Sequence, residues 1–300
     1  MFPQLPVLAA FSTAATPSSA GLALIGAALM VALAGVPTVF GPVRDSGNVQ
    51  VYTISSEYQS GETRLKVLLP DRLDRASKYP VLYVLPVEAG DGTYWGDPLA
   101  EIKSHNLHNR FGLICVYPTF SQLPWYADHP EKAEIRQESY LLRVVLPAVE
   151  DRYPVLPGPK GRLLVGFSKS GWGALSLLLR YPDVFGRAAA WDAPLAVDRP
   201  VHFGMGEIFG TQQNFEEYRI LGLLGQRAEV LGRTEGSLRP PRLVLLGYGN
   251  FRRDHQIAHN LMETLKIPHV YRDGPHRKHH WQSGWLPEAV QCLVPPSTPG

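Results

Sequence analysis

Ser168 lies in the segment Gly166-Phe167-Ser168-Lys169-Ser170, between an apolar run at 162–165 and a segment of helical character at 175–180. A serine held between small residues at a sharp turn from strand to helix is the sequence form of a nucleophile elbow. The turn lifts the hydroxyl above the sheet edge, and the helix amino terminus behind it favours negative charge. The usual pattern ends in glycine, but Ser170 is also small enough to fit. The alternative interpretation is an ordinary strand–helix turn.

A serine hydroxyl is a weak nucleophile at neutral pH and needs an adjacent base, usually a histidine that a carboxylate orients. Six of the ten histidines follow residue 250. Three of them, His276, His279 and His280, lie in the cluster 274–281, directly after the last predicted strand. Serine, acid and histidine follow one another in this order along α/β-hydrolase chains, so this cluster is where we expect the base.

Strands and helices alternate along the chain, which indicates an α/β domain with a mostly parallel central sheet covered by helices on both faces. Several strands are continuous apolar runs, as expected for strands buried on both faces. A glycine-dotted insertion is expected at 201–235, and Pro147 is expected to bend the helix that contains it. The strands are predicted at 49–58, 62–69, 81–85, 111–117, 162–165, 184–191, 241–247 and 267–271, and the helices at 98–107, 138–152, 175–180, 254–266 and 286–293.

The composition excludes some classes of function. With 300 residues, 45% of them hydrophobic, the chain can bury a full core, and a net charge of +2 does not indicate nucleic-acid binding. The two cysteines are far apart and form no CxxC motif, so a structural zinc site is not expected. His255 and His259 stand one helical turn apart, but a zincin would need glutamate at position 256, which is glutamine. We therefore expect surface histidines and no metal.

The amino terminus is apolar. No charged residue precedes Arg44, residues 20–36 form an unbroken apolar or glycine run, and Ala32-Leu33-Ala34 is a possible A-x-A cleavage site. The run suits an export signal or a membrane tether, although the usual preceding Lys or Arg is missing. The alternative is a disordered or mis-started leader. We therefore predict a leader at 1–44 and one domain at 45–300, with the protein exported or membrane-tethered, and otherwise cytoplasmic.

Several blocks occur in the order and spacing of a known group. They are 79–85, 166–168, 180–185 and His279-His280-Trp281 followed by 286–289. With these blocks the chain resembles, over roughly 50–293, the putative esterase family, which shares its α/β-hydrolase group with esterase D and the antigen-85 mycolyltransferases. The resemblance implies an α/β-hydrolase fold and a serine hydrolase without a cofactor. Matching H-x-W to the family's catalytic histidine assigns the base to His279.

The sequence does not decide which residue is the acid that orients the histidine. The family usually places an aspartate in the loop after the strand predicted at 241–247. In that loop Asn250 stands nearest the expected position and Asp254 follows four residues later. Asp192, at the end of the strand after the elbow helix, is the second candidate. Asp254 could instead cap the helix that begins there, and Asp192 could be a turn residue.

An acyl-transfer site also needs two N–H donors for the oxyanion. One is expected from Lys169, directly after the nucleophile. The other is expected after 81–85, where relatives often carry His-Gly-Gly; here Pro86 lacks an N–H, so Val87 or Glu88 must supply it. The carboxylate of Glu88 is unfavourable near an oxyanion unless it points away or is paired. By the same resemblance, Trp125 and Tyr126 are expected to line the mouth of the pocket, unless they are ordinary packing residues.

The chain is thus predicted to be a serine-dependent carboxylic ester hydrolase that works through an acyl-enzyme. An acyltransferase using the same site is one alternative, and a non-catalytic binding protein on a hydrolase fold is another. The expected partner is a small-molecule, glycan or lipid ester. A hydrogen bond from Ser168 to His279, backed by a carboxylate, would favour the enzyme.

Overall fold

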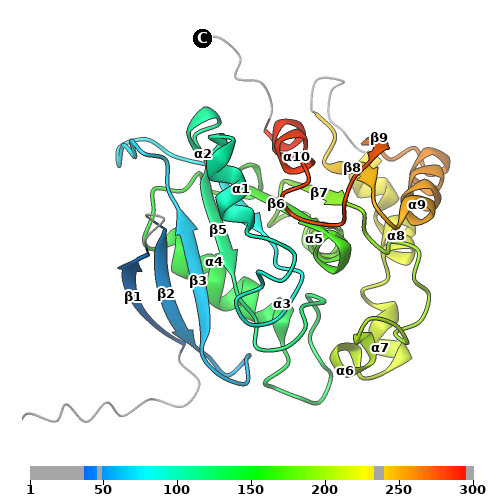
Figure 1. Cartoon of the computed structure of the whole chain (residues 1–300). Coiled ribbons are helices and arrows are strands. Elements are labelled where there is room, and N and C mark those ends of the chain that lie inside the picture. Colours follow the sequence, from blue (N-terminus) through cyan, green and yellow to red (C-terminus); the bar gives the residue numbers. More distant parts are fainter. Residues whose placement is uncertain (1–36, 46–48, 233–239, 295–300) are drawn as a thin grey trace, which may run out of the picture. The chain divides into compact units, whose positions relative to one another are not determined.

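The computed structural model describes residues 37–45, 49–232 and 240–294. In these ranges nine strands form one sheet in the order β1-β2-β3-β5-β4-β6-β7-β8-β9 (Figure 1). The six strands from β5 to β9 in this order are parallel, while β1, β2 and β3 are antiparallel to their neighbours. The bounds are β1 Thr38–Arg44, β2 Gln50–Ser55, β3 Thr63–Leu68, β4 Val81–Val84, β5 Ile114–Pro118, β6 Arg162–Phe167, β7 Arg187–Trp191, β8 Leu243–Tyr248 and β9 His269–His276.

Helices cover both faces of the parallel part, as the sequence predicts. Successive residues of β4 alternate between two buried clusters, since Val81 and Tyr83 belong to one and Leu82 and Val84 to the other. The first cluster also holds buried residues of α4, α5, α8 and α9, and the second holds residues of α1, α2 and α10. The bounds are α1 Pro98–Ser104, α2 Leu107–Arg110, α3 Gln137–Tyr140, α4 Leu146–Glu150, α5 Ser168–Arg180, α6 Met205–Phe209, α7 Gln212–Glu216, α8 Ile220–Gly232, α9 Arg252–Thr264 and α10 Leu286–Leu293.

Several predicted boundaries differ from the structure; for example, α5 begins at Ser168 and not at 175, and β9 extends to His276 and not only to 271. The helix predicted at 138–152 is divided into α3, a π-helical turn at Leu141–Val145 and α4. Pro147, at the start of α4, has no N–H to donate to the preceding turn, so the backbone there cannot keep the α-helical bonding pattern. The domain also begins earlier than residue 45, because β1 pairs with β2 over Thr38–Arg44.

The predicted signal or tether segment lies outside the described residues as far as residue 36. Within the ranges that the structure does describe, no helix has both the length and the hydropathy needed to cross a bilayer.

Candidate active site

The elbow at Ser168 is built by close backbone packing. β6 ends at Phe167 and α5 begins at Ser168, whose φ of +53° lies in the left-handed region that side chains rarely adopt. A Cβ added at Gly166 would lie 2.3 Å from the Ser170 carbonyl oxygen, so this position must be glycine. The Ser170 hydroxyl accepts from Phe167 N at 3.1 Å and donates to Phe167 O at 2.9 Å. Serine in place of the usual glycine therefore closes the turn with two hydrogen bonds of its own.

His279 is held by a buried carboxylate, that of Asp192, at the end of β7, the strand beside β6. Asp192 directly follows β7, and its side chain is inaccessible to solvent. Nδ1 of His279 lies 2.5 Å from Oδ2 of Asp192. Because a carboxylate can only accept, Nδ1 carries the proton and the lone pair of Nε2 is left to act as a base. The amide of Ser168 donates to the carbonyl oxygen of Asp192 at 3.1 Å, which ties the elbow to the same residue.

The loop after β8 supplies donors to this carboxylate instead of supplying the acid. The amide of Asn250 lies 2.6 and 2.8 Å from the two oxygens of Asp192, and the amide of Phe251 lies 2.6 Å from Oδ1. A Cβ at Gly249 would lie 2.7 Å from Oδ2, so the close approach requires glycine. Burial alone raises the pKa of Asp192. The hydrogen bonds from His279 and from the backbone amides of residues 249–251 outweigh burial and lower its pKa. Asp192 is thereby kept ionised.

Other candidates for the acid and the base are engaged elsewhere. Oδ2 of Asp254, in the first turn of α9, accepts from Ala196 N at 2.9 Å, and burial raises the pKa of this carboxyl. Nε2 of His276 lies 3.1 Å from the carbonyl oxygen of Gly249, and Nδ1 of His280 accepts from the amide of Gln282 at 3.1 Å. Of the two predicted carboxylates, Asp192 therefore contacts His279, whereas Asp254 binds the amide of Ala196.

An aromatic cage surrounds the imidazole of His279, whose side chain is 15% exposed. The rings of Trp95 and Phe167 contact it edge-on, with centroids 5.2 and 4.9 Å away, and the ring of Trp191 lies 6.0 Å away. The cage limits the orientations of the imidazole without competing for its nitrogens. Trp95 is a site residue that the sequence analysis missed, since a tryptophan in a glycine-rich loop carries no motif.

The hydrogen bonds of the described residues do not include one between Ser168 Oγ and His279. The two residues are nevertheless neighbours, because the ring that precedes Ser168 in the chain, Phe167, packs against the imidazole. Such hydrogen bonds are often long in a free enzyme and tighten when substrate binds.

The loop after β4 carries the second candidate oxyanion donor. The hydroxyl of Tyr126 donates to the carbonyl oxygen of Pro86 at 2.5 Å. The peptide between Pro86 and Val87 is trans, so its N–H, on Val87, points away from that carbonyl. Tyr126 thus fixes the direction of the Val87 N–H, one of the two predicted oxyanion donors after β4. The candidate partner donor, Lys169 N–H, lies in the first turn of α5, where amides have no intrahelical acceptor.

The carboxylate of Glu88 is paired, which is the condition that the sequence analysis set for it. Its Oε1 lies 2.8 Å from Nζ of Lys169 and 3.0 Å from Nε1 of Trp95. The side chains of Lys169 and Glu88 are 13% and 26% exposed, so the pair is largely shielded from water. It neutralises the charge of Glu88 and joins the loop after β4 to the elbow.

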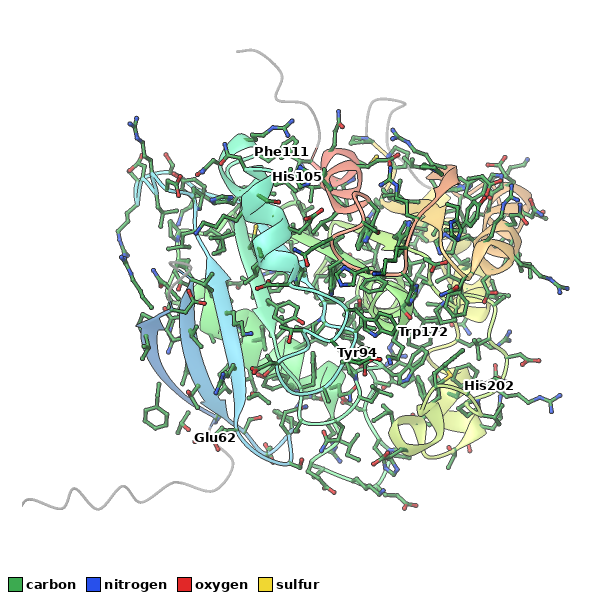
Figure 2. The ribbon with its side chains drawn as sticks, viewed as in Figure 1. Glu62, Tyr94, His105, Phe111, Trp172 and His202 are labelled. Carbon is green, nitrogen blue, oxygen red and sulfur yellow. The ribbon has the colours of Figure 1, made fainter. Side chains whose placement is uncertain are left out.

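Trp125 and Tyr126 are fully buried, so the prediction that they line an open pocket mouth is wrong. Nε1 of Trp125 donates to Phe203 O, and its ring packs edge-on against Trp172, a residue of α5 that Figure 2 labels. A Cβ at Gly173 would lie 2.0 Å from the ring of Tyr126, so this ring packs directly beneath α5. Their role is to support the loop and the elbow from below.

His255 faces the site from α9 and does not pair with His259. Its side chain is buried, and its Nε2 accepts from the amide of Ala193 at 2.9 Å, next to Asp192. Burial lowers the pKa of His255 to about 4, so the ring is neutral at pH 7. The sequence analysis placed this histidine on the surface; it is instead a buried support for the peptide that carries the candidate acid.

The mostly parallel sheet, the elbow at its carboxyl edge and the His279–Asp192 pair define a protein of α/β-hydrolase fold. Solved structures share this fold. A ferulic acid esterase matches with a TM-score of 0.64 and 20% identity over 82% of this chain and 96% of its own. Fluorophosphonate-binding serine hydrolase F of Staphylococcus aureus matches with a TM-score of 0.64 and 16% identity, over 87% of this chain and 99% of its own. MPT51 of Mycobacterium tuberculosis matches with a TM-score of 0.60 and 15% identity, over 80% of this chain and 94% of its own.

The sequence model of the family described as "Putative esterase" matches residues 56–219, and the chain belongs to this family. It is thus an esterase-type hydrolase, and the predicted resemblance and fold are confirmed. No match was found among curated proteins.

Proposed function

We propose that the protein cleaves carboxylic esters through an acyl-enzyme on Ser168. The hydrogen bond of 2.5 Å between His279 and the buried Asp192 is the observation that carries the proposal. A buried, ionised carboxylate fixes the tautomer of the base and stabilises the imidazolium that forms when the base takes a proton. Neither Asn250 nor Glu88 argues against catalysis, because Asn250 supports Asp192 through its amide and Glu88 is neutralised by Lys169.

In the first step, Ser168 Oγ attacks the ester carbonyl carbon while its proton passes to Nε2 of His279. A bond forms between Oγ and carbon, and the carbonyl electron pair moves onto oxygen. The N–H groups of Lys169 and Val87 are the proposed donors to this oxyanion. As the intermediate collapses, the ester C–O bond breaks and the leaving alkoxide takes the proton from His279. The products are an alcohol and an acyl-Ser168 ester.

In the second step, a water molecule gives its proton to Nε2 of His279 and adds to the acyl carbon. The second tetrahedral intermediate expels Ser168 Oγ, which regains the proton, and a carboxylic acid leaves. A sugar or lipid hydroxyl in place of this water would make the same site an acyltransferase. We propose hydrolysis of a small-molecule, glycan or lipid ester, in agreement with the family and with the name of the ferulic acid esterase neighbour.

A fluorophosphonate probe on the full chain tests the proposal, because such probes phosphonylate only a serine that a neighbouring base activates. We expect stoichiometric labelling of the wild type and none of Ser168→Ala. Ser176→Ala is the matched control, since Ser176 is a buried serine in the same helix and should leave labelling unchanged. A folded wild type that is not labelled, or a Ser168→Ala variant that still is, would overturn the assignment.

A further inference from the structure

A second group of side chains with metal-ligand chemistry lies at the other end of the sheet from Ser168. His259 and Glu263 stand one turn apart on α9, and His269 is the first residue of β9, whereas His279 follows the end of β9. Nδ1 of His259 lies 2.8 Å from Nε2 of His269, and Oε1 of Glu263 lies 3.7 Å from the same Nε2. All three ligand atoms are within 4.8 Å of one another.

The tautomer of His269 is set by the backbone. Its Nδ1 lies 2.8 Å from the carbonyl oxygen of Ile267, and because a carbonyl can only accept, Nδ1 must carry a proton. In the neutral ring the lone pair therefore sits on Nε2 and points at His259 and Glu263. A ring N–H donated to a backbone carbonyl is the usual outer-shell arrangement of a metal-binding histidine.

Hydrogen bonds within the group do not satisfy all three atoms. A proton that Nδ1 of His259 donates to Nε2 of His269 serves that pair alone, and the carboxylate of Glu263, 3.7 Å from Nε2, receives no proton from either nitrogen. The His269 side chain is only 2% exposed, so water gives it little screening. A divalent cation satisfies both nitrogens and the carboxylate at once. The ring of His259 is already oriented, since it stacks on Tyr271 with centroids 4.0 Å apart and planes at 13°.

We propose that His259, Glu263 and His269 form a binding site for a divalent transition-metal ion, for which Zn²⁺ is the best-fitting candidate. Two imidazoles and one carboxylate are a common three-residue zinc donor set, with water as the fourth ligand. At metal–nitrogen distances of about 2.1 Å the two nitrogens must move apart by roughly 0.5 Å. The proton between them is displaced to solvent or to Nε2 of His259. The side chain of Glu263 is 66% exposed and has room to rotate onto the ion.

Such an ion would join α9 to the edge strand β9, and β9 leads into the segment that carries His279. The proposed site is therefore a structural one, far from the reacting atoms, and it does not depend on the proposed function. It also differs from the sequence-based expectation, which considered His255 with His259 and predicted no metal.

The test is a titration of chelator-treated, full-length protein with Zn²⁺ in competition with a zinc-binding dye, together with thermal denaturation at each ratio. We expect one tight site per chain and a rise in Tm that saturates at one equivalent. Glu263→Gln and His259→Gln should each weaken the tight site at least about tenfold. His202→Gln, which removes an exposed histidine elsewhere, should leave it unchanged.

Glu263→Gln keeps the inference falsifiable, because its exposed side chain is not required for folding, which circular dichroism will check. The absence of a tight site in the wild type would overturn the proposal. So would a tight site that persists in both variants, since the ion would then bind elsewhere on the chain.

Discussion

The carboxylate that orients His279 directly follows β7 and does not come from the loop after β8, where the family resemblance places the acid. Asp192 lies beside Ser168 because Phe167 and Trp191 pair in the β6–β7 ladder and because the amide of Ser168 donates to the carbonyl of Asp192. Asn250 stands at the usual acid position and contributes its backbone N–H instead of a carboxylate.

Replacing Asp192 by Asn should lower kcat for ester hydrolysis about 10³- to 10⁴-fold, because an amide can neither fix the tautomer of His279 nor stabilise its charged form. Asp254→Asn is the matched control. It removes a carboxylate from the adjacent turn that binds Ala196 N, and it should reduce kcat less than about tenfold. Steady-state kinetics on a chromogenic ester measures both. A larger loss in Asp254→Asn than in Asp192→Asn would mean that the acid is misassigned.

Ser168 and His279 could be predicted as nucleophile and base because each lies in a short pattern whose local structure depends on its neighbours. The sequence does not decide which residue is the acid, because the contact between His279 and Asp192 joins residues 87 positions apart. That contact depends on which strand lies beside β6, which no local pattern records. For the same reason, the sequence does not show whether the carboxylate of Glu88 is paired. Its partners, Lys169 and Trp95, belong to different elements.

Among the elements, the loop after β4 is held from two sides. Tyr126 binds the carbonyl of Pro86 from below, and Lys169 reaches Glu88 from the elbow. The loop therefore cannot move relative to the elbow without breaking two shielded interactions.

Lys169→Met should lower kcat about 10- to 100-fold with a smaller change in KM. It keeps the backbone N–H but leaves the charge of Glu88 unpaired near the developing oxyanion. Two unit charges several ångströms apart interact by roughly 2–3 kcal/mol at an effective dielectric constant near 20. The double variant Lys169→Met/Glu88→Gln removes both charges and should recover most of the loss. Equal kcat values for the single and double variants would show that the charge of Glu88 does not act on the reaction.

Most of the elements are predictable because their apolar runs and helical spacing report burial directly, as in β4 and α5. β1 escaped prediction because it directly continues an uncharged, apolar segment that is expected, from the sequence, to be a leader. The burial of Trp125 and Tyr126 escaped prediction because aromatic residues of a loop can line a pocket or pack beneath it, and composition does not distinguish the two.

At the scale of the whole molecule, His255 makes the stability of the fold depend on pH, because the neutral form of this buried ring holds the peptide next to Asp192. Its ring is enclosed between α9 and the end of β7, and among the described residues its Nδ1 has no hydrogen-bond partner. Protonation of this ring would place a charge in the interior and would abolish the acceptor at Nε2 that holds Ala193 N.

The free energy of unfolding should therefore fall as the pH drops from about 6.5 to about 4. The pKa of His255 is about 4 in the folded chain and about 6.5 in the unfolded chain, so between these values the unfolded state binds the extra proton. The contribution of this residue to the loss is about 3 kcal/mol, complete near pH 4. Urea denaturation at pH 7.5, 5.5 and 4.5 measures it.

In His255→Gln the amide oxygen can still accept from Ala193 N, but nothing titrates. The difference in stability between wild type and this variant should therefore shift in favour of the variant as the pH falls. The exposed His202→Gln provides the comparison, and its curve should run parallel to the wild type. Parallel curves for His255→Gln as well would contradict the burial of a neutral imidazole.

The order of the strands along the chain also sets the order in which the proposed site residues are synthesised. Ser168 and Asp192 emerge on consecutive strands, whereas His279 comes only after the edge strand β9. A growing chain that has reached β8 thus holds the proposed nucleophile and acid side by side, yet has no base to activate the hydroxyl. Under the proposed mechanism, ester cleavage needs His279, which is translated only after β9, so a chain that ends at β8 is expected to be inactive toward esters.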